Sequence, residues 1–148
     1  MDKVMQWGIL STANIAQQSI IPAIQHSKNS EVYAIASESG KATELANLFQ
    51  IQKAYDSYYA LLEDPEIEAV YIPLPNALHK KWVIESAKKG KHVLCEKPAA
   101  LNLSDLEEMV QTYAENDVFF MEGFMYQFHP VRLGRSSIST LFLPSNSI

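Results

Sequence analysis

Residues 4–18 read V-M-Q-W-G-I-L-S-T-A-N-I-A-Q-Q, and this stretch predicts a strand, a tight turn and a helix in succession. Residues 4–10 are a mostly apolar run of strand length, residues 11–14 are small or turn-forming, and a helical pattern opens at Ile15. A helix entered through such a turn points unpaired N–H groups and the positive end of its dipole at whatever lies over the turn. The arrangement therefore favours a bound phosphate.

The same stretch contains a degraded form of the dinucleotide fingerprint G-x-G-x-x-G/A. In that fingerprint the first glycine makes the turn, the second lets a pyrophosphate approach, and the third packs helix on strand. The counterparts here are Gly8, either Leu10 or Ser11, and Ala13 or Ala16. Taken alone, the pattern is equally compatible with an ordinary strand-to-helix connection of an α/β domain.

Length, composition and charge indicate one globular domain. The chain has 148 residues, 47% of them hydrophobic and 20% charged, which suffices for a packed core without disulfides or metal. Its formal charge of −5 gives no general attraction for nucleic acid or an anionic membrane. The single cysteine, Cys95, cannot form an internal disulfide, and no signal peptide or membrane-spanning run is visible. We expect a cytoplasmic protein without a metal site.

Apolar and polar segments alternate along the chain as strands and helices do. Six strands are predicted at residues 4–10, 32–36, 54–55, 69–72, 92–95 and 118–121. Helices are predicted at residues 15–26, 42–49, 57–62, 80–89 and after 104. This βαβ rhythm predicts an α/β fold, a doubly wound and mostly parallel six-stranded sheet over residues 1–125.

Several local features refine this prediction. Pro22 predicts a kink or break in the first helix, and Pro73 and Pro75 predict a rigid loop that is neither helix nor strand. Leu48 is expected to face inward in the second helix, and Gly90 to cap the fourth. Residues 104–107, S-D-L-E, are expected to form a capping box.

Polar side chains follow the predicted strands at their carboxyl ends, where open α/β sheets bind ligands. Ser37, Glu38 and Lys41 follow the second strand, at the spacing where a carboxylate would accept hydrogen bonds from a ribose and repel a 2′-phosphate. The positive charge of Lys41 would instead attract a 2′-phosphate. A solvated loop of mixed charge is an equally good interpretation of the spacing.

Two further loops carry candidate side chains. Asn76 and His79 lie in the proline-containing loop, although a lone histidine is more often a capping or surface residue. Glu96 and Lys97 follow the fifth strand and precede Pro98, which suggests that the Lys97 ammonium is held in a defined position. An ordinary loop ion pair is the alternative.

Four motifs together resemble the Gfo/Idh/MocA oxidoreductase family, which includes glucose–fructose oxidoreductase and inositol dehydrogenase. They are W-G-I-L-S-T-A-N-I-A at 7–16, P-L-P-N-A-L-H at 73–79, C-E-K-P-A-A at 95–100 and M-E-G-F-M-Y-Q-F-H-P at 121–130. The wording of the first and last motifs is most similar to the branch containing dimeric dihydrodiol dehydrogenase. The resemblance implies a Rossmann domain that binds NAD or NADP, followed by a second α/β domain.

The resemblance also implies roles for individual residues. Lys97 would be the catalytic residue, hydrogen-bonding the reacting hydroxyl while hydride passes to the nicotinamide; an Asp and a His or Tyr of the second domain would complete the site. Pro98 is often cis in this family. The residues implied for the pyrophosphate are Gly8, Ser11, Thr12, Ala13, Asn14 and Ile15; for the adenosine ribose, Ser37 and Glu38, with Lys41 nearby; for the nicotinamide half, Pro73, Leu74, Asn76, His79, Glu96 and Lys97.

Two departures from the family pattern affect the functional prediction. Many members have Arg at the position of Glu38 and use NADP, so the acid favours NAD, while Lys41 keeps NADP open. Residues 131–148 have no helical face, so we interpret residues 126–148 as a truncated or frameshifted tail. We expect an NAD(P)-dependent oxidoreductase acting on a secondary alcohol of a sugar, cyclitol or diol. This chain would bind cofactor but lack most of the catalytic site; the alternative is a non-catalytic nucleotide-binding module or an inert fragment, and a homo-oligomer is possible.

Overall fold

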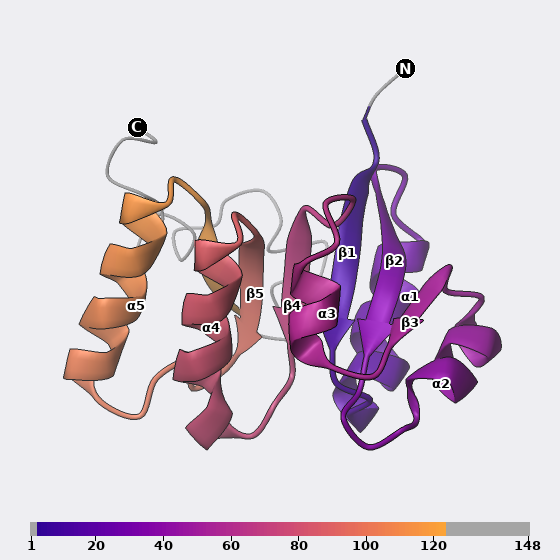
Figure 1. Ribbon diagram of the computed structural model, residues 1–148, viewed down its shortest axis with the longest axis horizontal. Coiled ribbons are helices and arrows are strands. Elements are labelled where there is room, and N and C mark those ends of the chain that lie inside the picture. Colours follow the sequence, from indigo (N-terminus) through magenta and orange to yellow (C-terminus); the bar gives the residue numbers. More distant parts are fainter. Residues whose placement is uncertain (1–2, 124–148) are drawn as a thin grey trace, which may run out of the picture. The chain divides into compact units, whose positions relative to one another are not determined.

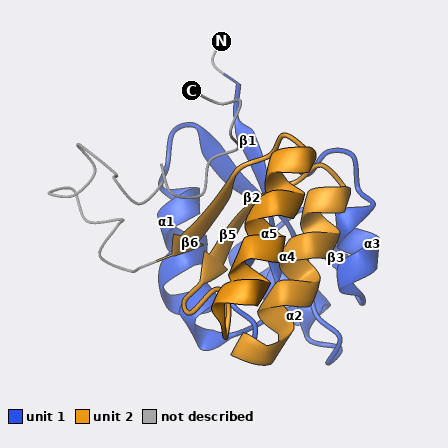
Figure 2. Ribbon diagram, turned by 90° about the vertical axis from the view of Figure 1, so that its left-hand side faces the viewer, with its two compact units in different colours: residues 1–74 blue, residues 75–148 orange. Residues whose placement is uncertain are grey.

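The computed structural model describes residues 3–123. The chain divides into two compact units, unit 1 with residues 1–74 and unit 2 with residues 75–148 (Figure 2). The predicted tail, and the part of the last motif beyond Gly123, lie outside the described residues. Among residues 3–123, no helix is both long and apolar enough to cross a membrane.

Unit 1 is built on four parallel strands in the order β3-β2-β1-β4 (Figure 1). The strands are β1 (Met5–Leu10), β2 (Ser30–Ala36), β3 (Lys53–Tyr55) and β4 (Ala69–Ile72). The helices are η1 (Ala16–Ile20, a π-helix), α1 (Ile21–Gln25), α2 (Ala42–Phe49) and α3 (Tyr58–Leu62). Helix α1 lies behind the strands in Figure 1 and α3 in front of them, so both faces of the strands are covered. All four residues of β4 are buried, as expected for a strand covered on both faces.

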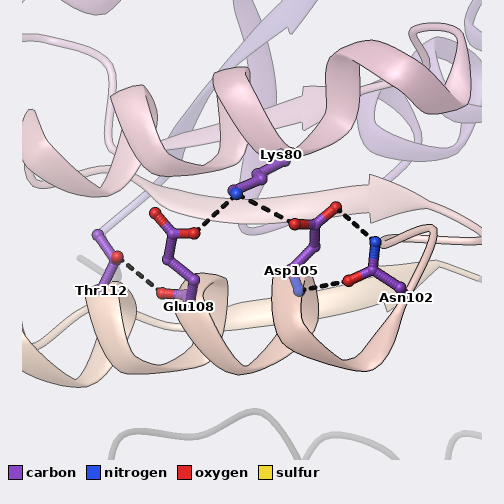
Figure 3. Close-up of polar contacts among 5 residues, drawn as sticks. All are labelled: Lys80, Asn102, Asp105, Glu108 and Thr112. Atoms are coloured by element: carbon purple, nitrogen blue, oxygen red, sulfur yellow. Dashed lines mark hydrogen bonds and ion pairs between the residues drawn. The ribbon is translucent and has the colours of Figure 1, made fainter.

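Unit 2 has two parallel strands and two longer helices. Its elements are η2 (Asn76–Leu78, a 3₁₀ helix), α4 (His79–Lys88), β5 (His92–Glu96), α5 (Leu103–Glu115) and β6 (Phe120–Gly123). Lys80 at the start of α4 forms ion pairs with Asp105 at 3.0 Å and Glu108 at 2.7 Å, both on α5 (Figure 3). These contacts join the start of α4 to the first two turns of α5.

The first helix is irregular but not interrupted at Pro22, for which the sequence predicts a kink or a break. A π-helical segment ends at Ile20, and α1 begins at Ile21 with Pro22 in its first turn. Proline has no N–H to donate, and the change from π-helical to α-helical hydrogen bonding lies directly beside it. Gly90 has a positive φ of 76° directly after the last residue of α4's cap, which agrees with its predicted role in ending that helix.

Three local predictions are wrong. Leu48 is 67% exposed, because the buried stripe of α2 is formed by Ala42, Leu45 and Ala46 and Leu48 falls beside it. The loop expected over residues 73–79 contains η2, and α4 already begins at His79. Proline restricts the residue before it more than those after it, so a helical turn can follow Pro75.

The third correction concerns the start of α5. Its N-cap is Asn102 rather than Ser104, and the Asn102 side chain accepts a hydrogen bond from the Asp105 amide at 2.9 Å. Asn102 thus caps a first-turn amide as Ser104 was expected to do, but two residues earlier in the chain. The last strand is likewise displaced, to Phe120–Gly123.

Ser11 occupies an unusual backbone conformation between β1 and the first helix. Its φ is 139°, in the region that favours glycine, and its N–H donates to the Ala36 carbonyl at 3.0 Å. The Ser11 Oγ accepts a hydrogen bond from the Ala13 amide at 3.0 Å. Ser11, and not Leu10, therefore stands where the fingerprint needs its conformationally free glycine.

Gly8 lies inside β1 and not in the turn. A Cβ at Gly8 would stand 2.6 Å from Leu61 Cδ2 and 3.3 Å from Ile67 Cδ1, so α3 and the chain after it leave no room for a side chain. The register of β1 and β2 also shifts here, since Trp7 pairs with Val32 and Gly8 with Ala34. Gly8 is thus a packing glycine beside a β-bulge.

We expect Ser11→Gly to be more stable than Ser11→Ala by about 1–2 kcal/mol, because both lose the Oγ hydrogen bond but only glycine adopts the positive φ without strain. Urea unfolding measures the difference. The exposed Gln18 provides the control pair, since alanine is the better residue inside a helix. If Ser11→Gly and Ser11→Ala were equally stable, or if alanine were the more stable residue at position 11 as it is expected to be at position 18, Ser11 would not occupy a glycine-favouring conformation.

Gly8→Ala should lower the free energy of unfolding by roughly 1–3 kcal/mol through overpacking against Leu61. In a Leu61→Ala background the same change should cost less, because the colliding methyl groups are absent. A double-mutant cycle in urea measures this coupling. Additive effects would mean that Leu61 does not impose the glycine.

Candidate functional site

The turn after β1 presents backbone amides without partners. Ala13 donates to Ser11 Oγ, and the Thr12 carbonyl accepts from Gln17 Nε2 at 2.7 Å. The amides of Thr12, Asn14 and Ile15 have no hydrogen-bond partner among residues 3–123, and none of these residues is buried. Three unpaired donors around one turn at the start of a helix form a site of anion-binding type.

The loop after β2 is fixed by hydrogen bonds at Ser37. Ser37 is 2% exposed, its N–H donates to the Tyr55 carbonyl at 3.1 Å, and its Oγ accepts from the Ser39 amide at 3.1 Å. Glu38 and Lys41 are exposed on the same loop. The buried Ser37 therefore anchors a loop on which Glu38 and Lys41 present charges of opposite sign to the solvent.

Tyr58, the first residue of α3, contacts this loop at Glu38. Its ring is buried, and the backbone of Glu38 hydrogen-bonds its hydroxyl. Burial raises the pKa of the Tyr58 hydroxyl, and the nearby Glu38 carboxylate raises it further. The phenol therefore stays neutral and holds Glu38 in place through its backbone.

In unit 2, His79 is a buried hydrogen-bonding residue. It is 1% exposed, and its Nδ1 lies 2.8 Å from the Pro98 carbonyl oxygen. This contradicts the expectation that a lone histidine is a capping or surface residue. Asn76, by contrast, is exposed in η2.

The chain after β5 presents the candidate lysine. Lys97 is exposed and Glu96 half-buried, and the Lys97–Pro98 peptide bond is cis, as the family resemblance implies. The next amide, that of Ala99, donates to Glu122 Oε2 at 2.8 Å. Glu122 was not predicted as a site residue, although it stands in the quoted M-E-G motif.

Cys95 precedes these residues but does not have the properties of a reactive thiol. It is fully buried in β5, and burial raises its pKa, with the Glu122 and Glu96 carboxylates adding to the effect. A neutral, inaccessible thiol is a core residue.

The predicted residues thus fall into two groups, one in each unit. Unit 1 brings Ser11–Ile15 together at the turn after β1 and Ser37, Glu38 and Lys41 at the loop after β2, while Pro73 and Leu74 are buried after β4. Unit 2 brings His79 beside the segment that follows Glu96 and Lys97. Gly8 is the exception, because it lies within its strand.

Comparison with known proteins agrees with this geometry. The sequence model of the Gfo/Idh/MocA oxidoreductase family, described as having an NAD-binding Rossmann fold, matches residues 5–124. A D-xylose 1-dehydrogenase (NADP(+)) of Haloferax volcanii is 46% identical over 128 residues, which are 86% of this chain and 39% of that protein. A trans-1,2-dihydrobenzene-1,2-diol dehydrogenase of Xenopus laevis is 36% identical over 132 residues, 85% of this chain and 39% of that protein.

A solved structure gives the same result for the fold. A 3-ketoreductase from Actinomadura kijaniata, crystallised with NADP, matches with a TM-score of 0.82 and 33% identity, over 89% of this chain and 42% of that one. The predicted doubly wound, mostly parallel six-stranded sheet is therefore confirmed, as is the predicted cofactor class, NAD or NADP. The chain spans about two fifths of the length of these relatives. This chain belongs to the Gfo/Idh/MocA oxidoreductase family, with its NAD-binding Rossmann fold.

Proposed function

We propose that the turn after β1 holds the pyrophosphate of a nicotinamide dinucleotide in a hydride-transfer oxidoreductase. The observation that carries the proposal is the set of three unpaired amides, those of Thr12, Asn14 and Ile15. A negatively charged chain, with a formal charge of −5, can hold an anion there only through local donors. Backbone amides at a helix start supply such donors without any lysine or arginine.

The adenosine ribose would lie against the loop after β2. Glu38 can accept hydrogen bonds from the ribose hydroxyls and repels a 2′-phosphate, whereas Lys41 attracts one. The xylose dehydrogenase and the 3-ketoreductase are both named with NADP. We therefore propose that the choice between NAD and NADP depends on the balance of these two exposed charges.

Lys97 would act on the substrate side. Its exposed ammonium can donate a hydrogen bond to the reacting hydroxyl and favour the negative charge that develops on that oxygen. The cofactor, when bound, accepts or supplies the hydride. Lys97 is also proposed to line the nicotinamide half, together with Pro73, Leu74, Asn76, His79 and Glu96.

The names of the relatives support a proposal for the substrate class. The proteins matched are named for D-xylose, for a dihydrobenzene diol and for a dTDP-linked keto sugar. We propose a secondary alcohol of a sugar, cyclitol or diol, or the corresponding ketone. For the chain as given, we propose cofactor binding without appreciable turnover; steady-state NADH or NADPH formation with a polyol panel would overturn that part.

The pyrophosphate site is tested by Ala13→Asp. We expect the dissociation constants of NADH and NADPH to rise at least about tenfold, because a carboxylate beside the phosphates costs well over 1 kcal/mol at short range. The fold should be preserved, since an acid near a helix start is stabilising. Isothermal titration calorimetry measures the affinities, and thermal unfolding checks the fold.

The matched control is Gln18→Glu, which makes the same charge change at an exposed position of η1. It should change both affinities less than Ala13→Asp does, because position 18 is exposed, lies further along the helix and is screened by water and salt. Equal binding by the two variants would refute the proposed pyrophosphate site. A wild-type chain that binds neither dinucleotide would refute the function itself.

The ribose loop is tested by the ratio of NADPH to NADH affinity. Glu38→Gln should raise this ratio by roughly tenfold and Lys41→Gln should lower it several-fold, because each removes one charge facing the 2′-phosphate. Both shifts should shrink in 1 M salt. Glu107→Gln, exposed on α5, is the control; an unchanged ratio in the Glu38 variant would exclude this loop as the selector.

A further inference from the structure

The segment Lys97–Ala99 is held by side chains from two other elements. His79 at the start of α4 binds the Pro98 carbonyl at 2.8 Å, and Glu122 on β6 binds the Ala99 amide at 2.8 Å. All of these residues belong to unit 2. The two hydrogen bonds engage consecutive residues directly after Lys97, so they fix the path of the chain at that residue.

The Glu122 contact satisfies a donor that water cannot reach. Ala99 is 1% exposed, so without the carboxylate its N–H would lack a partner. The register of β5 and β6 sets the position of Glu122, which pairs with Cys95 while Gly123 pairs with Glu96. A Cβ at Gly123 would stand 3.2 Å from Leu94 Cδ1. The strand therefore brings the carboxylate beside the end of β5 with little freedom.

The His79 contact defines a ring tautomer. A carbonyl oxygen can only accept, so Nδ1 must carry the proton. The start of α4 is itself anchored, because Lys80 forms ion pairs with Asp105 and Glu108 on α5 (Figure 3). Asp105 in turn is bound by Asn102, which caps α5 three residues after Ala99. The chain after Lys97 is thus held at Pro98, at Ala99 and again at Asn102.

We propose that Glu122, together with His79, is a positioning residue that sets the direction of Lys97 toward the nicotinamide end of the cofactor. The inference rests on the proposed function of Lys97. Glu122 does not touch substrate or cofactor in this role; it acts through the Ala99 amide. Its carboxylate is needed as a hydrogen-bond acceptor, so glutamine should replace it and leucine should not.

The test compares Glu122→Leu with Glu122→Gln in the full chain. Both remove the charge, but only glutamine keeps an oxygen for the Ala99 amide. Amide hydrogen exchange, followed by NMR, should be at least about tenfold faster at Ala99 in the leucine variant, with little change in the glutamine variant. Equal exchange in the two variants would overturn the contact.

Ligand affinity tests the consequence for Lys97. NADH and ADP-ribose share the adenosine and pyrophosphate half, but only NADH reaches the nicotinamide end. Glu122→Leu should weaken NADH binding roughly tenfold, which corresponds to about 1.4 kcal/mol, and leave ADP-ribose binding unchanged. Equal weakening of both ligands, or of neither, would overturn the positioning role.

The outcomes separate this inference from the proposed function. If the wild type binds neither ligand, the proposed function fails, and the positioning role fails with it. If the wild type binds both ligands and Glu122→Leu binds like Glu122→Gln, only the positioning role fails. Nitrogen-15 spectra of the His79 ring should show the Nδ1–H tautomer at neutral pH; an Nε2–H tautomer would overturn the part assigned to His79.

Discussion

The backbone at Ser11 is the constraint on which unit 1 depends. β1 is hydrogen-bonded on both sides, to β2 and to β4, and it ends in the fully buried Leu10. The chain must then turn sharply enough to begin a helix at once, which places Ser11 at a φ of 139°. Such a conformation costs a non-glycine residue about 1–3 kcal/mol. Among residues 3–123, the same turn leaves the amides of Thr12, Asn14 and Ile15 without partners, so the strained residue and these open donors are one feature.

Unit 2 contains the complementary arrangement, in which a buried donor is satisfied rather than left open. Ala99 is buried, and its amide is bound by a carboxylate from a strand 23 residues away along the chain. Donors exposed at a turn can bind a ligand, whereas donors in the interior must be paired internally. The two units thus differ in their backbone amides: unit 1 leaves three open at a turn, and unit 2 pairs a buried one with a carboxylate.

Much of the fold could be predicted because its signals are local. β4 and α2 were predicted with the bounds that the structure has, since a buried parallel strand and an amphipathic helix are visible in consecutive residues. Leu48 and the N-cap of α5 were missed because several local patterns fit and packing chooses between them. His79 was expected at the surface for another reason: its partner, the Pro98 carbonyl, belongs to a distant segment. Glu122 is the clearest case, because no spacing rule connects a glutamate on β6 with the amide of Ala99.

Residue type and backbone conformation do not coincide at positions 8 and 11 of the fingerprint. The chain has glycine at position 8, where a Cβ would collide with Leu61, and serine at position 11, where the backbone itself favours glycine. The first requirement is steric, because a Cβ at position 8 would have to displace the buried Leu61 methyl groups. The second is a conformational cost, which the Ser11 Oγ offsets by accepting the Ala13 amide. A residue that makes a compensating hydrogen bond can therefore stand in for a fingerprint glycine, while a glycine required by packing can be mistaken for one. The fingerprint sequence is degraded because packing constrains position 8 and backbone conformation constrains position 11.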